Sequence, residues 1–182
     1  MGKEKYAIPK KAFANDVKRI RNLLEMTQKE FASFVGVSTP TVERWEASTS
    51  QIKGPIVMLL DMIENNMDYI NKAKLPKKEW PIRLLYMHNQ KICTLIDVNE
   101  AKREVKICNY TNNLMFRAFG SKENPTFDDY QEFLKSRCFP ENRDKIKLVL
   151  EDLNLPFYDA FLIIQKTQGR MADDNFWIEI EE

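Results

Sequence analysis

The segment MTQKEFASFVGVSTPTVERWE, residues 26–46, decides the fold of the first part of the chain. Thr27 can cap a helix, and Glu30 three residues later completes a capping box. Gly36 ends this first helix, and Ser38 is placed to cap a second one. The segment therefore predicts two short helices joined by a tight turn at Gly36.

Two short helices joined in this way form a helix-turn-helix. Phe31, Ala32 and Val35 lie on the inner face of the first helix, and the small side chain of Ala32 permits a close crossing of the two helices. Val42 and Trp45 face inward from the second helix. That second helix has to project from the body of the domain, so that its first turn can enter a DNA major groove about 12 Å wide.

Further helices are predicted on both sides of this segment. Apolar residues recur at intervals of three and four over residues 13–24, which places them on one helix face. A second stripe follows Pro55 and predicts one long helix to about Lys72, whereas the polar residues 47–54 are expected to form a loop. The stripes consist of Phe13, Val17, Ile20 and Leu24, and of Ile56, Leu60, Ile63, Met67 and Ile70.

Charge is distributed unevenly along the 182 residues. The net charge is +1, which excludes a histone-like polycation, but residues 1–60 carry ten basic and six acidic side chains, a balance of +4. The remaining residues therefore carry a balance of −3. A basic first third joined to a slightly acidic remainder favours a polyanion-binding part attached to a body with another role.

The sequence LLEMTQKEFASFVGVSTPTVERWE, residues 23–46, resembles the Xre/Cro-repressor helix-turn-helix family. The stretch GPIVMLLDMI, residues 54–63, is similar to the version found in HigA-type antitoxins, and the resemblance covers roughly residues 12–65. It implies a DNA-binding protein whose Arg21 and Glu46 form a structural pair.

The resemblance also implies a set of DNA contacts. Gln28 and Ser38 would donate to phosphates, and Lys29 and Lys53 would contact the backbone, which positions the protein without specifying sequence. Arg44 would read a base edge, because a guanidinium can bond guanine O6 and N7 together. The predicted DNA-binding residues are Gln28, Lys29, Ser38, Thr39, Pro40, Thr41, Arg44 and Lys53.

The contacts expected at the start of the second helix are mainly apolar. Thr39 and Pro40 offer little hydrogen bonding to bases but could contact a thymine methyl group, and Thr41 is adjacent. Before the first helix, Lys3, Lys5, Lys10 and Lys11 form either a solvated terminus or an arm on the DNA backbone or in a minor groove.

The pattern changes after residues 72–81, a stretch with two prolines and four lysines that is expected to be a linker. Strands are predicted at 82–87, 91–98, 104–110 and 175–181, helices at 127–138 and 143–153, and residues 159–166 fit either form. These elements predict an α+β chain in which an all-α helix-turn-helix domain (1–75) is joined to a small α+β domain (80–182).

The second part resembles the small N-terminal subdomain of HipA-type kinases. An S-R-x-x-P-x-x-R step and a D-x-x-W-I ending carry this resemblance, through Ser136, Arg137, Pro140 and Arg143, and through Asp174, Phe176, Trp177 and Ile178. The five glycines form no phosphate loop and the kinase body is absent, so we expect no kinase activity. Arg137 and Arg143 either bind an anion or stabilise the proline turn.

Three roles remain open for this second part. It could hold or sense a protein partner, such as a kinase-like toxin that lacks this subdomain, or it could sense a small ligand. It could also be an extra dimerisation domain. A hidden enzyme using Cys93, Cys108 or Cys138 with His88 as base is the third, although nothing in the sequence places these residues together.

These observations predict a cytoplasmic regulator without enzyme activity, cofactor or metal. Three widely spaced cysteines argue against a disulfide framework, and there is neither a secretory signal nor an apolar run long enough to span a membrane. We expect an autoregulating antitoxin-type or mobile-element repressor that binds a palindromic double-stranded operator as a homodimer. The alternative is a partner-binding protein, with a HipA-like partner, for which DNA binding is secondary.

Overall fold

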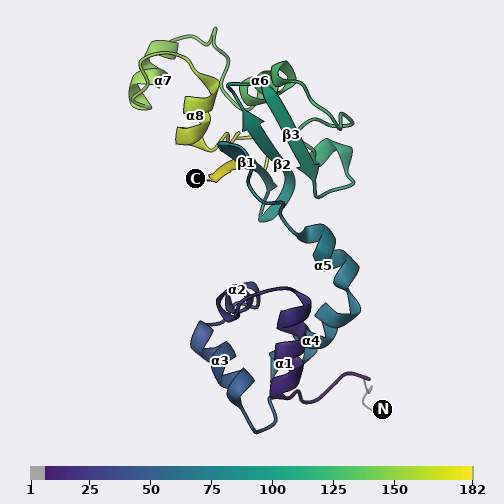
Figure 1. Cartoon of the computed structure of the whole chain (residues 1–182). Coiled ribbons are helices and arrows are strands. Elements are labelled where there is room, and N and C mark those ends of the chain that lie inside the picture. Colours follow the sequence, from purple (N-terminus) through teal and green to yellow (C-terminus); the bar gives the residue numbers. More distant parts are fainter. Residues whose placement is uncertain (1–6, 182) are drawn as a thin grey trace, which may run out of the picture. The chain divides into compact units, whose positions relative to one another are not determined.

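The computed structural model describes residues 7–181, which form two compact units (Figure 1). The first unit ends at Lys74 and the second begins at Leu75. Each unit has its own hydrophobic core. Lys3 and Lys5, predicted as part of a terminal arm, lie outside the described residues.

The regular elements of the first unit, in its described part, are helices. The predicted capping box is confirmed: the Thr27 hydroxyl accepts from the N–H of Glu30 (3.2 Å), and the Glu30 carboxylate accepts from the N–H of Thr27 (2.7 Å). The helices are α1 (Ala14–Leu23), α2 (Gln28–Phe34), α3 (Thr39–Ala47), α4 (Pro55–Asn65) and α5 (Met67–Ala73).

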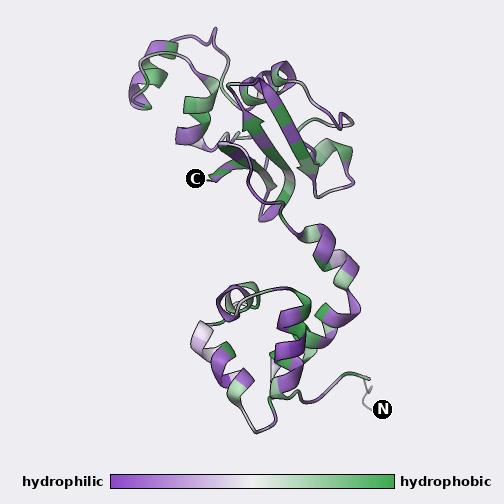
Figure 2. Cartoon of the chain, viewed as in Figure 1, coloured by the Kyte–Doolittle hydropathy of each residue, from purple (hydrophilic) through white to green (hydrophobic). Residues whose placement is uncertain are grey.

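The core of the first unit is built from the predicted apolar stripes except for Phe13, which precedes α1 as its N-cap residue and is 46% exposed. Helix α2 packs on α3, and α1 packs on both α3 and α4. Figure 2 shows the apolar residues alternating with hydrophilic ones along these helices. The buried side chains come from α1 (Val17, Ile20), α2 (Phe31, Ala32), α3 (Val42) and α4 (Ile56, Val57, Leu60, Ile63).

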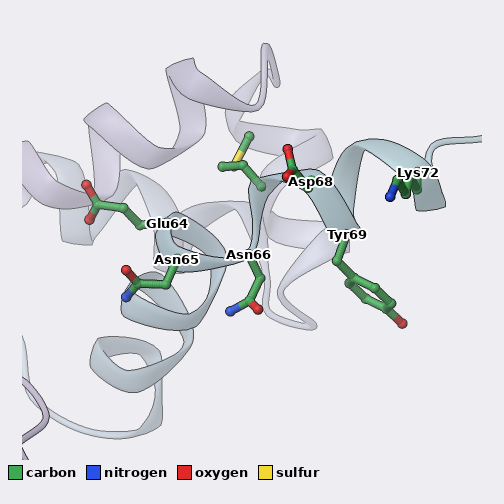
Figure 3. A pocket seen from close by; sticks show the side chains of 7 residues that line it. Glu64, Asn65, Asn66, Asp68, Tyr69 and Lys72 are labelled. Atoms are coloured by element: carbon green, nitrogen blue, oxygen red, sulfur yellow. The ribbon is translucent and has the colours of Figure 1, made fainter.

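The prediction of one long helix from Pro55 to Lys72 is wrong, because the helix breaks at Asn66. The backbone of Asn66 leaves the helical region, with φ −129° and ψ 34°. Its side-chain amide donates to the carbonyl of Met62 (2.7 Å), and the Asn65 amide donates to the carbonyl of Asp61 (2.9 Å). Asparagine side chains compete in this way with the backbone bonds of a helix. Figure 3 shows Asn65 and Asn66 beside the open hollow at the break.

The second unit is an antiparallel sheet with helices, so the predicted α+β class is confirmed. Its strands are β1 (Ile82–His88), β2 (Lys91–Asn99), β3 (Glu104–Asn109) and β4 (Phe176–Glu181), in the order β3-β2-β1-β4. Between β3 and β4 lie η1 (Leu114–Phe116), α6 (Phe127–Ser136), α7 (Ile146–Asp152) and α8 (Ala160–Thr167).

Two helix boundaries in this unit were not foreseen. Helix α7 begins at Ile146 rather than at Arg143, because Lys145 adopts a left-handed conformation with φ 58°. The ambiguous residues 159–166 form α8, whose first turn is capped by the Asp159 carboxylate accepting from the N–H of Leu162 (2.9 Å). Side-chain caps of this kind start a helix even where the apolar pattern is indistinct.

The two faces of the sheet are covered differently. The main core joins one face, through residues such as Leu84 and Ile96, to Tyr130 of α6 and Ile163 of α8. On the other face, a smaller apolar cluster consists of residues from the strands and from Tyr110, with no residue of a described helix. Its members are Leu85, Met87, Ile92, Leu95, Cys108, Tyr110 and Trp177.

Candidate nucleic-acid interface

A tight turn connects α2 and α3 at Gly36. The backbone of Gly36 has φ 72°, a left-handed conformation that glycine adopts at little cost. Directly after it, the N–H of Val37 donates to the carbonyl of Ala32 (2.9 Å), which closes the turn against the end of α2. The start of α3 is therefore fixed relative to α2.

Helix α3 buries one side and exposes the other. Val42 and Glu46 are buried, whereas Pro40, Glu43 and Arg44 are exposed. Of the residues predicted to contact DNA, Ser38 and Pro40 are exposed, and Thr39 and Thr41 are half-buried. The first turn of α3 and Arg44 thus lie on an accessible surface of the helix.

Arg44 is available for a ligand. Within residues 7–181, its guanidinium makes neither a hydrogen bond nor an ion pair. The group carries five N–H donors in a planar fork, and these match the two acceptors on the major-groove edge of guanine. Such a side chain on a helix of a helix-turn-helix can read a base without first giving up a protein partner.

Ser38 is the N-cap residue of α3, as predicted, but its side chain makes no capping bond. Instead its hydroxyl lies 3.0 Å from the hydroxyl of Thr41. The N–H of Thr41 is satisfied by the backbone carbonyl of Ser38 (2.9 Å). The hydroxyls of exposed Ser38 and half-buried Thr41 therefore form a small polar group at the start of the helix.

The predicted pair of Arg21 with Glu46 is confirmed, and it holds α3 against α1. Arg21 Nε donates to Glu46 Oε1 (2.6 Å), and a second guanidinium nitrogen donates to Oε2 (3.2 Å). Burial alone would raise the pKa of Glu46, but the hydrogen bonds from Arg21 and Gln28 outweigh it and leave the pKa below its ordinary value.

Gln28 has a contact that the sequence did not suggest. Its amide nitrogen donates to Glu46 Oε2 (2.8 Å), so Gln28 links the start of α2 to the buried carboxylate. The amide carries a second hydrogen, and the predicted contact of Gln28 with phosphate remains a prediction. The two residues are 18 positions apart on different helices, so no local pattern indicates their contact.

The two predicted backbone lysines lie in different elements. Lys29 is exposed on the first turn of α2, and Lys53 is exposed in the loop before α4. Ile52 of that loop forms an isolated antiparallel bridge with Ala12, which precedes α1, with N–O distances of 3.0 and 2.8 Å. The one sequence feature that indicates this bridge is Ile52 itself, an isoleucine within the otherwise polar residues 48–54.

The residues proposed for a hidden enzyme lie in apolar surroundings. Cys93 and Cys138 are buried, and burial raises the pKa of the Cys138 thiol to about 11. The His88 ring packs against the rings of Phe116 (4.4 Å between centroids) and Phe176 (4.7 Å). No cluster of His, Cys, Asp or Glu in residues 7–181 is arranged to hold a metal ion.

Arg137 connects the two segments on which the resemblance to HipA-type kinases rests. Its guanidinium donates to the Asp174 carboxylate (2.6 and 3.0 Å) and to the backbone carbonyls of Gly169 and Phe176. The side chain is only 8% exposed, so Arg137 stabilises the turn before β4, and Arg143 is exposed. The structural role was one of the two alternatives for Arg137.

Comparison with known proteins gives a family match within the first unit. Residues 17–61 match the family model described as helix-turn-helix, which spans α1 from Val17 to most of α4. This match supports a DNA-binding regulator, and it does not extend to the features shared with HigA-type antitoxins or HipA-type kinases. No curated protein and no solved structure matches the chain. None of the described helices has the length and apolar character needed to cross a membrane.

Proposed function

We propose that this helix-turn-helix chain is a sequence-specific repressor of transcription that places α3 in the major groove of its operator. The observation that carries the proposal is Arg44, whose unpaired guanidinium lies on the exposed side of a helix held from behind by Arg21 and Glu46. A rigid helix with a free guanidinium gives direct readout of guanine. Basic side chains of the first unit add affinity by releasing counterions from phosphates.

The experiment is a footprint on DNA upstream of the protein's own gene, followed by binding measurements with substituted duplexes. Arg44→Ala should weaken binding to the footprinted site by about 1–3 kcal/mol and remove discrimination at one base pair per half-site. Lys72→Ala, an exposed substitution on α5, is the control and should bind as the parent does. The proposal would be contradicted if Arg44→Ala bound the footprinted site with the parent's affinity and discriminated against substituted and mixed-sequence duplexes as well as the parent does.

We further propose that the repressor is a homodimer on a palindromic operator. One recognition helix covers few base pairs, and two half-sites multiply specificity. Met58 and Met62 support a contact through α4, because they lie one turn apart and are 48% and 52% exposed. Sedimentation at tens of micromolar should give a dimer, and Met62→Glu should shift it toward monomer. A monomeric parent, both free and on DNA, would defeat this proposal.

A second candidate role concerns the second unit, which we propose holds a protein partner with a HipA-like kinase fold in an autoregulating antitoxin system. Ile92, Cys108 and Trp177 favour it, since they are half-buried members of an apolar cluster to which no residue of a described helix belongs, whereas Leu85, Met87 and Leu95 of the same cluster are buried. Products of adjacent genes should co-purify with the full chain. Loss of co-purification on Trp177→Ala, with retention on Phe157→Ala, would support this face, whereas loss on neither would exclude it.

A further inference from the structure

The chain segment that precedes α1 is anchored to the loop that follows α3. Ala12 and Ile52 exchange both backbone hydrogen bonds, and both side chains are buried. In an antiparallel pair that exchanges both bonds, the flanking residues face each other with their side chains close together. The register therefore places Lys11 opposite Lys53, on the side away from the core.

This pairing brings two like charges together, and neither has a charged partner. Lys11 and Lys53 are both exposed, and within residues 7–181 neither ammonium makes an ion pair or a hydrogen bond, since the nearby Asp16 carboxylate accepts from the N–H of Phe13. Like charges directly opposite each other on neighbouring strands are destabilising. An anion bound between them would offset that repulsion.

The neighbouring side chains help to define the patch. The ammonium of Lys11 lies 5.7 Å from the centre of the exposed Phe13 ring, and Gln51 stands opposite Phe13 in the same register. Lys10, also exposed, adds a third positive charge next to Lys11. Because α3 ends at Ala47, the Lys53 side of this patch is connected to the recognition helix by one short loop.

We propose that Lys11 and Lys53 form a preformed clamp for the phosphate backbone of DNA, in which each lysine neutralises one phosphate. This inference rests on the proposed function, because the clamp would hold the backbone of the DNA that α3 reads. It replaces the flexible arm considered for Lys10 and Lys11 with a fixed contact, since the bridge holds the segment in place. A fixed contact loses less conformational entropy on binding than a flexible one.

The test measures how the affinity for a fluorescein-labelled, mixed-sequence duplex depends on salt. Each contacted phosphate contributes about 0.9 to the slope of log affinity against log salt concentration. Lys11→Gln and Lys53→Gln should each reduce the slope by about 0.9, and the double variant by about 1.8. Lys72→Gln makes the same change of charge on α5 and should leave the slope unchanged.

Thermal unfolding tests whether Lys11 and Lys53 stabilise the fold instead of binding phosphate. Lys53→Gln should not lower Tm, because it removes a repulsion and no hydrogen bond, and Lys11→Gln should lower it only as far as the lost contact of the Lys11 ammonium with the Phe13 ring contributes to stability. If the parent binds the duplex but Lys11→Gln has the slope of Lys72→Gln, the clamp is overturned and the proposed function stands. If the parent shows no affinity for duplex DNA even at low salt, the proposed function itself fails.

Discussion

Glu46 is buried on the inner side of α3, where its carboxylate accepts hydrogen bonds from Arg21 and Gln28. Its side chain is 4% exposed and that of Arg21 is 18% exposed. Removing one member of a buried ion pair leaves the other charge without compensation, which typically costs 3–5 kcal/mol. The orientation of α3, and with it the position of Arg44, depends on this pair.

We expect Glu46→Ala to lower the free energy of unfolding of the first unit by about 3 kcal/mol, the lower end of that range because water still reaches Arg21. Hydrogen exchange of the α1 and α3 amides measures this free energy directly. Glu43→Ala, on the exposed side of the same helix, is the matched control and should change it by less than about 0.5 kcal/mol. Equal effects of the two substitutions would contradict a stabilising role for the pair.

The same residue predicts how stability depends on pH. The pKa of Glu46 is lower in the folded protein than in the unfolded chain, where it is about 4.3. A group with a lowered pKa contributes stability above its unfolded pKa, and that contribution is lost as the pH falls through the folded pKa. The difference in stability between the parent and Glu46→Ala should therefore narrow as the pH falls below about 4.3. A difference that stays constant down to acid pH would show that the charge of Glu46 is not what stabilises α3.

At the scale of elements, the break between α4 and α5 follows from two adjacent asparagines. Asn66→Ala removes the side chain that competes for the carbonyl of Met62, and alanine has the higher helix propensity. We expect helical Cα chemical shifts to become continuous from Asn65 to Met67, with stability raised by about 0.5 kcal/mol. Asn71→Ala, within α5, is the control, since it improves propensity without acting on the break. Unchanged shifts at Met67 in Asn66→Ala would mean that packing, not the amide, interrupts the helix.

The sequence predicted those elements whose causes are local. The capping box of Thr27 with Glu30 starts α2, and intervals of three and four residues placed α1 and the core of α4. The break at Asn66 was not predicted, because the apolar stripe continues through it and Met67 and Ile70 still pack on the same core. The spacing of apolar residues does not reveal a helix break that is caused by a side chain bonding to the backbone within one turn.

The candidate site was predictable to a similar extent. The resemblance placed Arg44 on α3, and the structure leaves that side chain exposed, but its contact with bases remains a prediction. The Gln28–Glu46 bond and the Ala12–Ile52 bridge join residues far apart in the chain. Such contacts depend on how helices pack, which the spacing of residues along one element does not encode.

At the scale of the whole molecule, the two cores share no residue. Every member of the first core lies between Ala12 and Ile70, and every member of the main second core lies between Ile82 and Ile180. Residues 76–78 are bound to the second unit, since Arg83 donates to the carbonyl of Pro76 and Lys78 donates to that of Glu181. Each unit therefore buries its own apolar surface, which is the main source of folding stability.

Separate cores predict two calorimetric transitions in the full chain, each sensitive to substitutions in its own unit. Glu46→Ala should lower only one Tm, and Arg137→Ala only the other, because Arg137 bonds to Asp174 and to two backbone carbonyls within the second unit. Substitutions without shared partners act independently. Exposed Arg143→Ala is the control for Arg137→Ala and should leave both transitions in place. A single transition whose Tm is lowered by both Glu46→Ala and Arg137→Ala would mean that the units fold cooperatively. Binding of a ligand or partner to the second unit would then change the stability of α3 as well.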